Sequence, residues 1–211
     1  MKTDDLIRAL AADTVQAPPL RTTLLAGLVP SMMIAVLGVA LTLGFRTDLG
    51  TVMLTPVSLA RIVLTGILGL ASARLALLLA RPEGAQTARV WPLAAVAVAA
   101  LGLLLWAWVT TPAEARQMAT VGKTMTTCLV TIPLLSVLPV AVLHYTLRQG
   151  AVTAPLRAGF FAGLAGAGLS AAVYALHCTE DSPLFYVTWY GLAIAGVTLV
   201  STLIGARTLR W

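Results

Sequence analysis

The sequence predicts an all-α integral membrane protein, a bundle of six transmembrane helices with both termini in the cytoplasm. Three observations lead to this prediction. Apolar residues make up 59% of the chain and charged residues only 10%, whereas a soluble domain carries about 25% charged residues because its surface must be hydrated. The mean hydropathy is +0.92. Finally, the apolar residues form six long runs, and the basic residues between these runs are divided unevenly.

Each of the six runs reaches the roughly 17 to 25 residues that a helix needs to cross a bilayer core. They are predicted near Thr22–Phe45, Val57–Ala80, Val90–Val109, Thr124–Thr146, Ala154–His177 and Val187–Ala206. The first run begins after Arg21 and is longer than the roughly 7 to 15 apolar residues of a signal-peptide core, so we expect a retained span. Three parts follow: a cytoplasmic N-terminal segment (1–21), a six-helix transmembrane domain (22–206) and a short basic cytoplasmic tail (207–211).

The basic residues in the loops and at the ends of the spans give the orientation of the bundle. If the N-terminus is cytoplasmic, nine of them lie inside: Lys2, Arg8, Arg21, Arg81, Arg89, Arg148, Arg157, Arg207 and Arg210. Three lie outside: Arg46, Arg116 and Lys123. Because basic loops tend to stay in the cytoplasm, both termini are predicted to be cytoplasmic. The loops 46–56, 110–123 and 178–186 then face the periplasm, or the exterior if the cell has one membrane.

The N-terminal segment MKTDDLIRALAADTVQAPPLR is predicted to form a short amphipathic helix. It has a threonine that can cap the helix, two acids that suit its positive end, and an apolar stripe at helical spacing. The residues concerned are Thr3, Asp4, Asp5, Leu6, Ile7 and Leu10. Two roles remain open: a helix that lies along the membrane surface, or a helix that docks in the groove of a soluble partner.

Polar and small residues within the spans are explained by packing and lipid contact. Arg61 and Arg74, in the second span, are predicted to extend toward the lipid headgroups. Gly159, Gly163 and Gly166 give the fifth span a small-residue face for close helix contact. All eight acidic residues fall in loops or the N-terminal tail, whereas an ion-coupled transporter keeps acids near the membrane midplane. Transport is therefore disfavoured.

Other function classes find no support in the sequence. The basic residues are scattered between apolar runs rather than gathered on one face, which argues against direct binding of nucleic acid. No phosphate-binding glycine loop, paired-histidine zinc motif or serine–histidine–carboxylate set stands out, so no catalytic residue is predicted. Any chemistry must lie at helix ends, in loops or within the bundle.

The stretch LHCTEDSPLFYVTWY, residues 176–190, gathers His177, Cys178, Glu180 and Asp181 at the outer end of the fifth span. Cys128 lies about one turn inside the outer end of the fourth span, so both thiols belong to the same side of the membrane. The imidazole and carboxylates can lower the pKa of a thiol or complete a soft-metal site, with Cys128, His177 and Cys178 as possible ligands. A redox- or metal-sensing site, a plain stabilising disulfide and two inert small side chains remain open.

Several segments together resemble a known family. They are MKTDDLI at the start, FRTDL after the first span, a lone cysteine opening the fourth span, ALHCTEDSPLFYVTWY and a terminal LRW. In this combination the chain is similar, over almost its whole length, to the NrsF-type family of six-span bacterial membrane anti-sigma factors.

The resemblance implies a protein of the bacterial inner membrane that holds an extracytoplasmic-function sigma factor inactive and releases it during oxidative or heavy-metal stress. It also implies that Cys128 and Cys178 are the functional cysteines and that Met1–Leu10 holds the sigma factor. No cofactor is expected beyond a transient soft metal ion at the cysteines.

Two alternatives remain, a membrane thiol–disulfide oxidoreductase and a small heavy-metal carrier. The first usually needs a second thiol pair or a quinone site, and only one pair of cysteines exists here. The second needs further soft ligands leading inward through the spans.

Overall fold

The computed structural model describes residues 3–12 and 18–210, and every regular element within these ranges is a helix. Six of these helices are long and apolar enough to cross a membrane, as the sequence predicts. They are α2 (Leu20–Thr42), α4 (Pro56–Leu79), α6 (Trp91–Thr110), α8 (Met125–Arg148), α9 (Pro155–Tyr174) and α10 (Pro183–Thr208). The shorter ones are α1 (Thr3–Ala12), α3 (Leu49–Val52), α5 (Gly84–Thr87) and α7 (Ala113–Val121).

Some helix ends differ from the predicted ones because local backbone geometry, and not hydropathy, sets them. α10 begins at Pro183 rather than at Val187, since proline suits the first turn of a helix, where its missing N–H is not needed. α9 ends at Tyr174 rather than at His177. The chain after α2 turns at Gly44, whose φ of 76° is a conformation that glycine adopts without strain.

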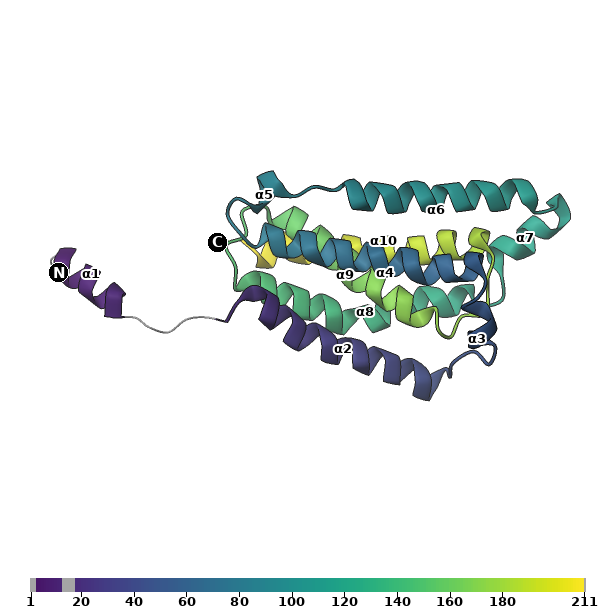
Figure 1. The fold of residues 1–211 in the computed structure, drawn as a ribbon, viewed down its shortest axis with the longest axis horizontal. Helices are drawn as coiled ribbons and strands as arrows, with labels where there is room; N and C mark the ends of the chain where they lie inside the picture. The colour runs from purple at the N-terminus through teal and green to yellow at the C-terminus, as the bar shows by residue number, and fades with distance from the viewer. Residues whose placement is uncertain (1–2, 13–17, 211) are drawn as a thin grey trace.

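The helix α9 forms the centre of the bundle (Figure 1). α4, α8 and α10 pack against it, and α2 packs against α8. In its most apolar stretch 67% of α9 is buried, against 11% of α6, which lies along one edge of the bundle. The central helix therefore contacts protein on all sides, whereas α6 presents most of its surface to the surroundings.

The predicted small-residue face of α9 is confirmed. A Cβ atom added to Gly159 would lie 2.8 Å from the carbonyl oxygen of Ser201 on α10, and one added to Gly163 would lie 2.7 Å from the Cα of Thr198. Such separations leave no room for a side chain, so these glycines allow the two backbones to touch. Close packing of this kind is a main source of helix association in a membrane.

The bundle has two buried clusters, one toward each end. We call the end where α9 connects to α10, through residues 175–182, the thiol end; its cluster includes Cys128, Ile132, Tyr174, Cys178, Phe185 and Tyr190. The opposite end, where α2 begins and α10 ends (Figure 1), is the tail end; its cluster includes Leu24, Leu28, Leu75, Leu79, Leu143, Leu147 and Phe161. The helices α4, α8 and α9 contribute side chains near both ends.

Candidate functional site

Cys128 and Cys178 lie against each other inside the thiol end. Cys128 is in the first turn of α8, and Cys178 lies in the connection between α9 and α10. Their side chains are 0% and 1% exposed, and both are free thiols. Both belong to one buried cluster, and each thiol is close enough to influence the ionisation of the other. An adjacent pair of this kind can be oxidised to a disulfide or can bind a soft metal ion.

The surroundings of Cys178 favour its thiolate form. The neighbouring Cys128 thiol lowers the pKa of the Cys178 thiol below its usual value, and the positive charge of Arg61 acts in the same direction. Burial opposes this shift but does not cancel it. Cys178 is therefore the member of the pair that loses its proton more readily, and the thiolate is the form that attacks oxidants and binds soft metals.

Two tyrosines enclose the thiols. Tyr174 from α9 and Tyr190 from α10 are 0% and 2% exposed, and their ring centroids are 5.7 Å apart. Both hydroxyl groups are buried without a hydrogen-bond partner in the part of the chain that the structure describes. The thiol pair therefore shares its buried cluster with two tyrosines whose hydroxyl groups are not hydrogen-bonded within the described residues.

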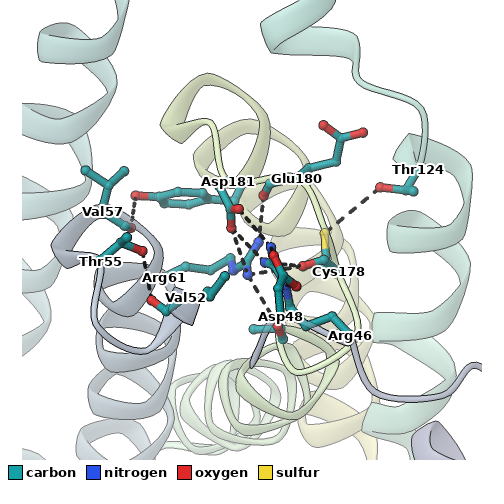
Figure 2. A network of polar contacts seen from close by, with 12 residues as sticks. Arg46, Asp48, Val52, Thr55, Val57, Arg61, Thr124, Cys178, Glu180 and Asp181 are labelled. Atoms are coloured by element: carbon teal, nitrogen blue, oxygen red, sulfur yellow. Dashed lines mark hydrogen bonds and ion pairs between the residues drawn. The ribbon is translucent and has the colours of Figure 1, made fainter. Parts of the chain in front are cut away.

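Arg61 of α4 holds the connection that carries Cys178 (Figure 2). Its guanidinium donates hydrogen bonds to the carbonyl oxygens of Glu180 (2.6 Å), Cys178 (3.2 Å) and Ala175 (3.3 Å). The last carbonyls of a helix have no donor within the helix, and the planar fork of an arginine offers five N–H groups to them. Arg61 thus fixes the chain that leaves α9.

The prediction that Arg61 extends to the lipid headgroups is wrong. Its side chain is 0% exposed, and the carboxylate of Asp181, 3.5 Å away, balances its charge. A buried guanidinium is tolerated when it is paired and hydrogen-bonded, and the connection after α9 offers both a carboxylate and carbonyl groups. Arg74, on the same helix, is exposed.

A second arginine fastens the same connection from the other side. Arg46, in the loop after α2, donates to both carboxylate oxygens of Asp181 (2.8 and 2.9 Å) and of Asp48 (2.7 and 2.9 Å), and to the carbonyl of Cys178 at 3.1 Å. These bonds raise the pKa of Arg46. Burial acts to raise the pKa of Asp181, but Arg46 and the charge of Arg61 outweigh it, so this pKa is lowered. Asp181 is therefore a carboxylate at neutral pH.

The remaining predicted residues of the block face other partners. The Nδ1 of His177 is 2.9 Å from the carbonyl oxygen of Gly44, and since a carbonyl only accepts, Nδ1 carries the proton. One oxygen of Glu180 accepts the backbone N–H of Lys123 at 2.7 Å. His177 and Asp181 therefore tie the connection to the loop after α2, and Glu180 ties it to the loop before α8.

A metal site of three protein ligands is not assembled in this conformation. Among residues 3–12 and 18–210, no group of three or more His, Cys, Asp and Glu side chains is arranged to hold a metal ion. The protonated Nδ1 of His177 is turned to the loop after α2. The two thiols, by themselves, are the donor set that the described site offers to a soft ion.

The sequence did not single out Arg46, Arg61, Tyr174 and Tyr190 as parts of the site. The tyrosines resemble ordinary apolar residues of a span, and Arg46 was counted only as a basic residue of an outer loop. For Arg61 a signal exists: an arginine about one turn inside a span lies at the depth of the acidic Glu180–Asp181 pair that follows another span. This position indicates how deep Arg61 lies in its span, but it does not indicate which residues Arg61 contacts.

The predicted partner-binding helix is present as α1, with exposed side chains at Thr3, Asp4, Asp5 and Ile7. The side chains of Leu6 and Leu10 lie outside the described residues. Figure 1 shows α1 apart from the six long helices. An exposed apolar residue such as Ile7, 59% exposed, is available for contact with another protein.

Comparison with known proteins extends over nearly the whole chain. The model of the family NrsF, described as "Negative regulator of sigma F", matches residues 9–211. The anti-sigma-F factor NrsF of Caulobacter vibrioides is 36% identical over an alignment of 217 positions that covers all of both chains. The probable anti-sigma-F factor NrsF of Azospira oryzae is 33% identical over 216 positions, again covering all of both. No solved structure matches. The chain therefore belongs to the NrsF family of negative regulators of sigma F.

Proposed function

We propose that this protein is a membrane anti-sigma factor that holds an extracytoplasmic-function sigma factor at the bacterial inner membrane and releases it under oxidative or heavy-metal stress. The observation that carries the proposal is the similarity over the full length to anti-sigma-F factors. The N-terminal segment 1–21, with its exposed helix α1, is the proposed sigma-binding element. The thiol pair Cys128–Cys178 is the proposed sensor.

The sensing chemistry that we propose is closure of a disulfide. An oxidant such as a peroxide or dichromate takes two electrons from the pair, the two thiols release two protons, and an S–S bond forms between Cys128 and Cys178. The placement of both free thiols in one buried cluster supports this step. A soft metal ion such as cadmium, bound transiently by the same thiolates, is the corresponding reaction for metal stress, with His177 as the further ligand if its ring turns.

Copurification tests the partner. Membranes solubilised from unstressed cells should yield the protein together with a sigma factor, and the sigma factor should be lost from the purified sample after treatment with dichromate or cadmium. A thiol–disulfide oxidoreductase as the captured partner, or no change upon treatment, would contradict the proposed function.

The orientation is tested by reporter fusions. The end of α4 and the end of α8 lie at the tail end, whereas α7 lies at the thiol end. Because basic residues predominate at the tail end, fusions at Gln86 and Gln149 should report the cytoplasm and a fusion at Ala113 should report the periplasm. The reverse pattern would put the thiols in the cytoplasm and would be incompatible with sensing from outside.

A further inference from the structure

We infer that Arg61 is the positioning residue through which a change at the thiol pair reaches the cytoplasmic end of the bundle. The inference rests on the proposed thiol sensing and adds the part of the protein that transmits it. Sensor and effector lie at opposite ends, so a contact must join the connection that carries Cys178 to a helix that runs to the tail end. Arg61 makes that contact with α4.

The first step is that Arg61 is hydrogen-bonded to the backbone around Cys178. Arg61 donates to the carbonyl oxygens of Cys178, Ala175 and Glu180 across 114 to 119 residues of sequence. It is 0% exposed, and its Nε has no partner among the described residues. No solvent is present at this depth to replace a lost hydrogen bond, so breaking one leaves a buried polar group without a partner. The guanidinium must therefore follow the carbonyls when the connection moves.

The second step is the movement that a disulfide requires. Both cysteines are free thiols, so their sulfur atoms are farther apart than the roughly 2.0 Å of an S–S bond. Cys128 is in a regular turn of α8, where the backbone is fixed by its helix hydrogen bonds, whereas Cys178 is in an irregular connection. Closing the bond therefore displaces the Cys178 side, and with it the carbonyl that Arg61 and Arg46 share.

The third step is transmission along α4. From Arg61 the helix continues without a break to Leu79, roughly 27 Å further on at about 1.5 Å per residue. There Leu75 and Leu79 belong to the same buried cluster as Leu24 and Leu28, which lie in the first turns of α2. The helix α2 directly follows the N-terminal segment. The helix α4 packs along α9, and α9 contacts α2, so a shift of α4 reaches the helix that follows the N-terminal segment through α9.

Arg46 also donates a hydrogen bond to the carbonyl of Cys178, but it is not part of a helix that runs to the tail end. It lies in the loop after α2 and divides its hydrogen bonds between Asp48 and Asp181 near the surface. It anchors the connection, but it is not part of a helix, because the irregular stretch 43–48, with its turn at Gly44, separates it from α2. We therefore assign the transmission of the signal from the thiols to Arg61.

The test separates thiol chemistry from sigma release. Arg61→Lys keeps a positive charge beside Asp181, but a single ammonium cannot hold three carbonyls in a planar fork; Arg61→Gln removes the charge as well. Arg74→Gln is the matched control, because it changes an exposed arginine of the same helix. Two quantities are measured in each strain: the fraction of Cys128–Cys178 disulfide after oxidant, and the ratio of sigma-dependent reporter activity with and without oxidant.

We expect both Arg61 variants to form the disulfide as the wild type does but to lose at least about 5-fold of the reporter ratio, the lower range of an allosteric coupling. Arg74→Gln should keep both the disulfide fraction and the reporter ratio of the wild type. A merely structural role would lower the amount of protein in the membrane, which an immunoblot detects, and would not separate the two readouts. An Arg61 variant that is present in the membrane and responds fully would overturn the inference.

A measurement on the unaltered protein covers the case in which neither variant accumulates. Hydrogen exchange of the purified wild-type protein is compared between the reduced and the oxidised state. Peptides from residues 56–79 should change their exchange on oxidation, and unchanged exchange throughout α4 would overturn the inference. If the wild type forms no disulfide and shows no stress response, it is the proposed thiol sensing that fails.

Discussion

Replacing either cysteine with serine is expected to abolish the stress response while leaving the protein in the membrane. Serine has nearly the size of cysteine, but it forms no disulfide and is a poor ligand for soft metals. In Cys128→Ser and Cys178→Ser, dichromate or cadmium should no longer raise the activity of a sigma-dependent reporter above that of unstressed cells. Each single variant should be as impaired as the double variant, because the two thiols act as one unit.

The matched control is Thr124→Ser, which keeps the hydroxyl that lies 4.0 Å from the Cys178 sulfur and removes only a methyl group; it should respond as the wild type does. Thiols of stressed cells, trapped in acid and labelled after denaturation, then identify the chemistry. If labelling of both thiols is lost and only a reductant restores it, the thiols have formed a disulfide. If a chelator restores the labelling, they have bound a metal ion. If both cysteines label equally before and after stress, the sensing role is refuted.

A charge on the apolar stripe of α1 is expected to release the sigma factor without stress. Ile7 is 59% exposed, so Ile7→Asp does not disturb a core of the protein. Loss of a central apolar contact in an interface costs about 2 kcal/mol or more, roughly a 30-fold loss of affinity. Ile7→Asp, and likewise Leu6→Asp, should therefore make the sigma-dependent reporter constitutive while the protein remains in the membrane fraction.

The control for this prediction is Arg8→Gln, a polar change at a position beside the stripe. It should leave repression intact, and copurification of the sigma factor should fall only in the two aspartate variants. Unchanged copurification in both of them would mean that the stripe does not contact the sigma factor. A helix on the membrane surface would then be the better explanation of α1.

The sequence by itself determined the six long apolar helices and the small-residue face of α9. A transmembrane helix is recognisable locally, because each span must be apolar over the thickness of the bilayer and must satisfy its own backbone hydrogen bonds. Gly159 and Gly163 likewise indicate close helix packing, but they do not indicate which helix packs there. The block around Cys178 was recognisable because polar residues are costly within an apolar chain and therefore indicate a site.

Only the tertiary structure decided which polar groups meet. Cys128 and Cys178 form a pair because α8 and α9 place their ends side by side, whereas His177, next in sequence to Cys178, turns to the Gly44 carbonyl. Arg61 was predicted to leave the bundle, and it instead binds the chain after α9, across a separation of up to 119 residues. A buried charge takes the nearest acceptors that the fold presents, and these come from segments whose distance in sequence carries no record of their contact.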